Sequence, residues 1–328
     1  MVPPLAPSFE RLFVLLNASG CLDALAAPDV ARSLDAFVTK TVTPLPRAGN
    51  APVRIAETDV GMLNSIGLAN PGRETFLAEV LPRLHELELP IWVSVGGFTA
   101  SEYAETCKLV DGREGVAAVE LNLSCPNVEE APQSAAEIVA ACRRVTTMPL
   151  YAKLSPATWD LAETATAVEA AGAGGLSLVN TIRGLALDER TLRPRLGTAS
   201  GGLSGPALKP IALAAVYTCR RAAELPIIGM GGVANGEDVL NLLAVGADDV
   251  ALGTVLFSDP GAPARIREEL TRELAARGLP DAGAVRGVAH SQGNLRAELE
   301  VKSPANRRKR GRLTAGTNLL SSCAHEWC

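Results

Sequence analysis

Residues 225–254 read Leu-Pro-Ile-Ile-Gly-Met-Gly-Gly-Val-Ala-Asn-Gly-Glu-Asp-Val-Leu-Asn-Leu-Leu-Ala-Val-Gly-Ala-Asp-Asp-Val-Ala-Leu-Gly-Thr. Two short apolar runs, Leu225–Met230 and Asp249–Gly253, flank an amphipathic segment, Glu237–Val245. Continuously apolar runs of this length are typical of parallel strands that are covered on both faces. Asn235 is a residue type that caps helix N-termini. The stretch therefore predicts a strand–helix–strand unit.

Six further apolar runs of the same kind precede this unit. They are Phe13–Ala18, Ala36–Thr41, Ile91–Val95, Ala117–Leu123, Pro149–Leu154 and Gly175–Asn180. Segments of helical periodicity alternate with them, namely Glu74–Leu89, Ser101–Val110, Ser134–Thr146, Thr158–Ala171 and Ala207–Ala223. Ser134 and Glu137 have the spacing of a capping box, which predicts a helix start at Ser134. Eight strand–helix alternations favour an α/β fold of the (β/α)8 TIM barrel type over an open doubly wound sheet.

Two connections are longer than is usual in such a barrel. Residues 42–90 contain a loop rich in Pro, Gly, Asn and Arg, and we expect either a functional lid or a small hairpin there. Residues 182–206 end in Gly201–Pro206, which we expect to be too rich in glycine for a helix or strand. From about Ser291 the composition changes, and the basic run Arg307–Arg312 follows. We therefore expect one barrel domain over 1–290 and a disordered basic C-terminal tail over 291–328.

Composition and charge exclude several classes of function. A formal net charge of −5 argues against nucleic acid or an anionic membrane as the main partner. No apolar run approaches the ~20 residues that span a bilayer, and the N-terminus lacks the basic start of a signal peptide. The seven cysteines, an odd number without a regular framework, indicate free thiols in a reducing compartment, so we expect a cytoplasmic protein. Cys323, His325 and Cys328 are too few ligands at a terminus to predict a metal site.

Glycines follow the last two predicted strands, at the end of a barrel where active sites lie. Gly231-Gly232 follows the seventh strand and Gly253-Thr254 the eighth. In barrels these two positions commonly bind a phosphate through backbone N–H groups and a helix N-terminus. The alternative is that these glycines only make tight turns. Their occurrence on consecutive strands favours phosphate binding.

Lysines and asparagines also follow predicted strands. Lys40 and Lys153 both end apolar runs, where a charge is costly unless it faces a partner or solvent. Four asparagines fall near the same end of the barrel, namely Asn64, Asn122, Asn127 and Asn180. Such a set of cations and amides suits a planar ligand rich in heteroatoms, and both a flavin ring and a pyrimidine fit that description.

The sequence offers few candidates for a general base. None of the three histidines follows a predicted strand, and Glu120 lies in mid-strand. The remaining candidate is Cys125, which follows the fourth strand in a Ser-Cys-Pro-Asn run typical of a turn. A thiol with an ordinary pKa of ~8.5 can act as a base when positive charge or desolvation tunes it. From spacing alone, a catalytic thiol and an inert buried thiol are equally supported.

The run Asn122-Leu-Ser-Cys-Pro-Asn-Val128 resembles the active-site signature of the class 1 dihydroorotate dehydrogenases, soluble FMN enzymes of pyrimidine biosynthesis. Other stretches resemble the family in the family's order between about Phe13 and Gly287. They are residues 17–20 (NASG), 39–43 (TKTVT), 64–68 (NSIGL), 152–156 (AKLSP), 179–181 (VNT), 201–206 (GGLSGP) and 228–232 (IGMGG). Several motifs in register make this resemblance specific.

The resemblance implies oxidation of (S)-dihydroorotate to orotate, with Cys125 removing the proton from C5 while hydride leaves C6 for N5 of FMN. The flavin contacts that it implies are Ser19, Lys40, Thr41, Ser94, Asn122, Lys153, Val179 and Gly205, with Gly231, Gly232, Gly253 and Thr254 at the phosphate. The substrate contacts that it implies are Lys40, Asn64, Ser65, Ile66, Gly67, Leu68, Asn122, Asn127, Asn180 and Thr181. A cation such as Lys153 would stabilise the anionic reduced ring.

The electron acceptor is open between two branches of the family. The Gly-Gly-x-x-Phe-Gly insertion usual in members with a partner subunit is absent after Asn127, and Val128–Gln133 is closer to the branch that uses fumarate. Arg54–Thr58 and Gly201–Pro206 instead resemble the branch that passes electrons to an FAD/iron–sulfur partner subunit and then to NAD. The resemblance also implies a homodimeric core. The alternative functions are a flavoenzyme like dihydropyrimidine dehydrogenase and a flavin-free, phosphate-binding barrel lyase or isomerase.

Overall fold

Eight parallel strands form the central sheet of the chain, for which a computed structural model describes residues 13–123, 132–158 and 160–291. The strands are β1 (Leu15–Asn17), β2 (Phe37–Val38), β5 (Ile91–Val95), β6 (Val116–Asn122), β7 (Leu150–Leu154), β8 (Gly175–Leu178), β11 (Ile227–Met230) and β12 (Asp249–Leu252). From β2 to β12, strands that are consecutive in this series are neighbours in the sheet, and β12 also pairs with β1. A parallel bridge between Leu16 and Ala36 joins β1 to β2, and Asn17 adds two 2.8 Å hydrogen bonds to the backbone of Val38. The predicted barrel and all eight strand runs are confirmed.

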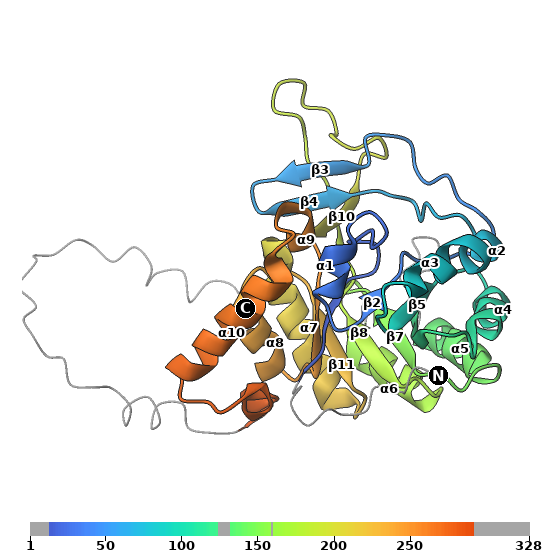
Figure 1. Cartoon of the computed structure of the whole chain (residues 1–328). Coiled ribbons are helices and arrows are strands. Elements are labelled where there is room, and N and C mark those ends of the chain that lie inside the picture. Colours follow the sequence, from blue (N-terminus) through green and yellow to red (C-terminus); the bar gives the residue numbers. More distant parts are fainter. Residues whose placement is uncertain (1–12, 124–131, 159, 292–328) are drawn as a thin grey trace, which may run out of the picture. The chain divides into compact units, whose positions relative to one another are not determined.

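Helices cover the outside of this ring (Figure 1). In chain order they are α1 (Pro28–Arg32), α2 (Arg73–Thr75), the π-helix η1 (Phe76–Val80), α3 (Leu81–His85), α4 (Ala100–Val110), α5 (Pro132–Arg143), α6 (Leu161–Ala170), the 3₁₀ helix η2 (Pro206–Leu208), α7 (Lys209–Ala222), α8 (Gly236–Ala244), α9 (Val255–Ser258), α10 (Ala262–Ala276) and the 3₁₀ helices η3 (Ala282–Val285) and η4 (Val288–His290). Asn235 caps α8 as predicted, because its side chain accepts a 3.0 Å hydrogen bond from the Asp238 N–H. The predicted start at Ser134 is wrong. Helix α5 already begins at Pro132, whose fixed φ suits a first helical position.

The alternation of side chains along each strand separates two cores. In β6, Val119 and Leu121 pack into the large cluster between sheet and helices, whereas Ala118 packs into the small cluster inside the barrel. Trp92 of β5 and Tyr151 of β7 also lie in the inner cluster, with ring centroids 4.4 Å apart. Because side chains on one face of a strand recur every second residue, the inward positions above this apolar layer are polar. They are Ser94, Glu120, Asn122, Lys153 and Ser177.

A second, antiparallel sheet of four strands stands at one end of the barrel (Figure 1). It contains β3 (Ile55–Thr58), β4 (Gly61–Asn64), β9 (Ile182–Gly184) and β10 (Gly201–Ser204). The β3–β4 pair is the small hairpin expected in the first long connection. The expectation that Gly201–Pro206 forms no strand is wrong, because β10 pairs with both β4 and β9. Glycine is needed there, since a Cβ on Gly202 would lie 2.0 Å from Thr181 Oγ1.

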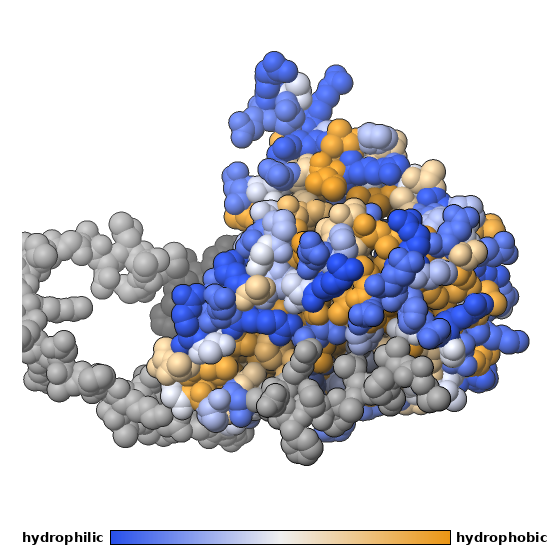
Figure 2. All heavy atoms as spheres, viewed as in Figure 1, coloured by the Kyte–Doolittle hydropathy of each residue, from blue (hydrophilic) through white to orange (hydrophobic). Residues whose placement is uncertain are grey.

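Between β9 and β10 the chain runs out into a projecting loop (Figure 1). Charged residues at positions 188–190, 193 and 195 are exposed on this loop, whose surface is mostly hydrophilic (Figure 2). Leu196 anchors its return, being buried against Ala56 and Leu63 of the small sheet. Within the described ranges, no helix has the length and apolar character required to cross a membrane.

Candidate active site

A cavity of about 1280 Å³ lies between the carboxyl ends of the barrel strands and the small sheet. From the barrel it is lined by Ser19, Lys40, Thr41, Asn122, Lys153, Asn180 and Thr181, and from the small-sheet side by Asn64, Ser65, Ile66, Gly67 and Leu68. Residues separated by more than 100 positions in the chain therefore face one space. This is the polar end of the barrel that the sequence predicts as the active site.

A smaller cavity of about 200 Å³ adjoins the first, sharing Ser19, Lys153 and Thr181 with it. Its other lining residues include Val179, Gly205, Gly231, Gly232, Gly253 and Thr254. Among the described residues, none accepts a hydrogen bond from the backbone N–H of Gly232, Gly253 or Thr254. Free N–H groups beside a glycine-lined space are suited to an anion such as phosphate.

Lys153 and Glu120 form a buried ion pair at the floor of the large cavity. Lys153 Nζ lies 3.3 Å from Glu120 Oε1, and the two side chains are 6% and 1% exposed. Strands β6 and β7 place them together, because Asn122 pairs with Lys153 in the ladder and Glu120 lies two residues earlier on the same face. The Lys153 ammonium group is therefore paired with the Glu120 carboxylate and still lines the cavity.

Lys40 is the second cation in this cavity. It follows β2 and approaches Gly20 so closely that a Cβ there would lie 3.0 Å from Lys40 Nζ. Gly20 also has a φ of +77°, which favours glycine. Burial lowers the pKa of Lys40, the nearby Cys21 opposes this shift, and the charge of Lys153 adds to it. An anionic ligand beside Lys40 would favour its charged form.

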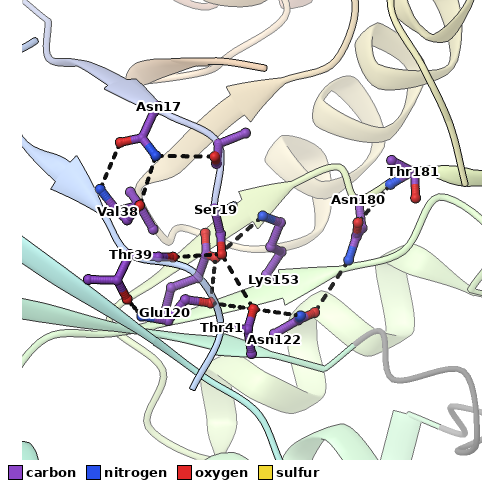
Figure 3. A network of polar contacts seen from close by, with 12 residues as sticks. Asn17, Ser19, Val38, Thr39, Thr41, Glu120, Asn122, Lys153, Asn180 and Thr181 are labelled. Carbon is purple, nitrogen blue, oxygen red and sulfur yellow. Dashed lines mark hydrogen bonds and ion pairs between the residues drawn. The ribbon is translucent and has the colours of Figure 1, made fainter. Parts of the chain in front are cut away.

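Side-chain hydrogen bonds connect the barrel interior to the cavity wall. Figure 3 shows most of the residues in this network. Asn180 Nδ2 donates to Asn122 Oδ1 at 3.3 Å, and Asn122 Nδ2 donates to Thr41 Oγ1 at 3.1 Å. Thr41 Oγ1 lies 3.0 Å from Ser94 Oγ, and Ser94 donates to Glu120 Oε1 at 3.2 Å. One continuous network therefore runs from the amides at the cavity to the buried carboxylate.

Most of the chain matches a family of known proteins. The family model described as dihydroorotate dehydrogenase matches residues 10–274. The chain belongs to this family. Among dihydroorotate dehydrogenases, the "Dihydroorotate dehydrogenase B (NAD(+)), catalytic subunit" of Desulforudis audaxviator is 43% identical over 267 residues, 79% of this chain and 87% of its own.

Proteins with the same name from two other organisms are equally similar. The relative from Latilactobacillus sakei is 44% identical over 289 residues, 84% of this chain and 94% of its own. That from Listeria monocytogenes is 44% identical over 253 residues, 75% of this chain and 83% of its own. The resemblance to dihydroorotate dehydrogenases inferred from the sequence motifs is confirmed.

Two predicted site residues of this dihydroorotate dehydrogenase, Cys125 and Asn127, lie outside the described residues. Ser94 is fully buried and does not line either cavity; its hydroxyl contacts Thr41 and Glu120. The other predicted flavin and substrate contacts all line one or both cavities. The roles assigned to these residues stay predictions.

Sequence reasoning missed several residues of the site. Glu120 lies in mid-strand, but its spacing of two from Asn122 places both on the inner face of β6. Cys21 lines both cavities, and burial raises its pKa while Lys153 and Lys40 act in the opposite direction. Arg183 lines the large cavity from β9, a strand that the sequence did not predict. Among the described residues no group of His, Cys, Asp or Glu could hold a metal ion.

Proposed function

We propose that this chain oxidises (S)-dihydroorotate to orotate in pyrimidine biosynthesis, with FMN as its bound cofactor. The observation that carries the proposal is that Lys40, Lys153, Asn122 and Asn180 line one cavity in a member of this family. The smaller, glycine-lined cavity beside it is called the annex below. Cations and amides line the barrel side of the large cavity, and the annex next to it is large enough for a phosphate group. A lyase or isomerase would have no evident use for so many amides around a buried ion pair.

The described residues fit FMN in chemistry and in size. The annex lined by Gly231, Gly232, Gly253 and Thr254 offers backbone N–H donors to a phosphate. A cavity of about 1280 Å³ has room for both a flavin ring and a pyrimidine. When bound, FMN would supply a hydride acceptor for the C6 hydrogen of dihydroorotate. Lys153 would stabilise negative charge on the reduced ring, as the resemblance implies.

Lys40 is our candidate for binding the carboxylate of the substrate. Because burial lowers the pKa of this ammonium group, an anionic partner restores what desolvation costs. The amides of Asn64, Asn122 and Asn180 would hydrogen-bond the ring carbonyl and N–H groups. Ser65–Leu68 and Thr181 would complete the contact from the small sheet and from the end of β8.

We propose Cys125 as the base that takes the proton from C5. Asn122 lines the cavity and Leu123 ends the described part of this segment, two residues before the cysteine. Among the described lining residues of both cavities there is no histidine, aspartate or glutamate to compete for the role. The thiolate would form where positive charge from the two lysines favours it.

We also propose that electrons leave through a partner subunit to NAD. The relatives in three organisms are each named as the NAD(+)-dependent catalytic subunit, a term that presupposes another subunit. The resemblance implies that this partner carries FAD and an iron–sulfur cluster and that two copies of the chain form a homodimeric core, in the cytoplasm. The absent insertion after Asn127 keeps fumarate as the acceptor to be tested against NAD.

Anaerobic reduction tests the first proposal. Purified protein loaded with FMN should lose its flavin absorbance on addition of dihydroorotate and release orotate. Bleaching by dihydrouracil but not by dihydroorotate would favour the dihydropyrimidine alternative, and failure to retain FMN would contradict the flavin assignment. Reoxidation of the reduced protein by fumarate, NAD or quinone, with and without a partner subunit from a relative, would identify the acceptor.

A further inference from the structure

We propose that Glu120 and Ser94 are positioning residues that set the orientation of the two amides in the binding cavity, Asn122 and Asn180. They would do so as the acceptor end of a hydrogen-bond chain with a single possible direction. The inference rests on the proposed function for the identity of the ligand. It gives a role to Glu120 and Ser94, which are buried and do not line the cavity.

The two ends of the chain fix its direction. At the cavity end, the backbone N–H of Thr181 donates to Asn180 Oδ1 at 2.8 Å, and a backbone N–H can only donate. At the buried end, Glu120 Oε1 accepts from Lys153 at 3.3 Å, and an ammonium group can only donate. A carboxylate in an ion pair only accepts.

Every link between these ends then has one proton assignment. Because Asn180 Oδ1 faces the Thr181 N–H, Asn180 Nδ2 faces Asn122 and donates to its Oδ1. Asn122 therefore donates through Nδ2 to Thr41 Oγ1. At the other end Ser94 gives its only proton to Glu120, so the 3.0 Å contact with Thr41 requires that the threonine hydroxyl donates. The assignments made from the two ends meet at Thr41 without conflict.

A neighbouring hydroxyl does not disturb this direction. Ser19 donates its proton to the carbonyl oxygen of Thr39 at 2.8 Å. Its 3.4 Å contact with Thr41 therefore adds no proton to the chain. Thr41 remains free to accept from Asn122 and donate to Ser94.

The consequence is a fixed pattern of donors at the cavity. Asn122 and Asn180 each keep one Nδ2 hydrogen outside the chain, available to a carbonyl or carboxylate oxygen of the ligand. If the chain lost its acceptor, Thr41 could turn its proton toward Asn122 Nδ2, and two donors would then face each other. Flipping the Asn122 amide would relieve that contact but would place its Nδ2 against Asn180 Nδ2, so neither orientation would satisfy both contacts. A flipped Asn122 would also turn its Oδ1, in place of an N–H donor, toward an oxygen of the ligand.

The test is a pair of matched substitutions. Ser94→Ala removes a hydroxyl from β5 beside Glu120 in the β5–β6 ladder. Ser177→Ala removes the same atom from β8 beside Lys153 in the β7–β8 ladder. Both side chains are 0% exposed, but Ser177 Oγ has no hydrogen-bond partner among the described residues. The readouts are the Kd for orotate from calorimetry on the FMN-loaded protein, the Kd for FMN, and the thermal midpoint.

We expect Ser94→Ala to raise the Kd for orotate by about tenfold or more, because a mispaired amide that faces the ligand is costly. Its Kd for FMN should rise by less than its Kd for orotate, because only one of the two amides, Asn122, is also a predicted flavin contact. Every binding constant of Ser177→Ala should stay within about threefold of wild type. Equal orotate affinity in the two variants would overturn the inference. So would a parallel loss of FMN and orotate in Ser94→Ala, since that is general loosening of the barrel. A wild-type protein that binds neither FMN nor orotate would instead contradict the proposed function, together with the ligand assumed here.

Discussion

Removing the charge of Glu120 should destabilise the protein strongly, because the carboxylate neutralises a buried ammonium group. The Glu120→Gln variant keeps an oxygen that accepts from Ser94 and Lys153, so shape and hydrogen bonding change little. What is lost is the counter-charge of a lysine whose side chain is 6% exposed. Breaking a buried ion pair by removing one partner typically costs about 3–5 kcal/mol. We expect a loss in this range.

The assay is urea unfolding of the cofactor-free protein, so that altered FMN affinity does not enter the difference. A half-exposed ion pair, Arg73–Glu105, provides the control, and Glu105→Gln should cost less than about 1 kcal/mol. The double variant Glu120→Gln with Lys153→Met should lose less than the sum of its single variants, because no unpaired charge remains. If Glu120→Gln cost no more than Glu105→Gln, the ion pair would not have the importance that its burial implies.

Three further predictions concern the proposed base, the annex and Asp249 at the start of β12. Cys125→Ala should retain FMN but reduce it at least about tenfold more slowly at neutral pH in stopped-flow mixing with dihydroorotate; a smaller effect would exclude Cys125 as the base. Gly232→Ala should weaken FMN binding by about tenfold or more in a fluorescence titration, since φ is +75° and its Cβ would lie 2.8 Å from the Lys209 nitrogen; Gly278→Ala, with φ +65° and no atom within 4 Å, should leave FMN binding unchanged. Burial raises the pKa of Asp249 to about 6, so the folded state holds a proton that the unfolded state releases, and stability should fall as pH rises from about 4 to about 6. Asp249→Asn should remove this dependence in urea unfolding and be more stable at pH 7 by about 1–2 kcal/mol, a range reduced for partial solvation; an unchanged pH profile would contradict the assignment.

The strands were predictable from the sequence because each barrel strand is buried on both faces. Runs such as Ile91–Val95 therefore stand out from their polar surroundings. The small sheet was harder, because β10 is half glycine and owes its conformation to close approach by β4 and Thr181. The approach of β4 depends on residues more than a hundred positions away. Local composition does not contain it.

The cavity-lining residues were predictable in type, since a polar residue at the end of an apolar strand must face a partner or solvent. Lys40 and Lys153 follow this rule and line the same cavity. The hydrogen bonds of Ser94 and Glu120 behind them were not predicted, because these two residues lie one inward-facing position farther from the cavity. Ser94 and Glu120 become a pair only through the register of β5 on β6, which the sequence alone does not specify. The motif around Cys125 required a comparison with a family rather than physical reasoning.

The most direct measurement of the central claim is an anaerobic titration of the FMN-loaded protein with dihydroorotate, in which absorbance and released orotate are followed together. The proposed chemistry predicts that flavin absorbance falls to a plateau and that one orotate forms for each FMN reduced. Bleaching without orotate, or orotate formation by protein that contains no flavin, would contradict it.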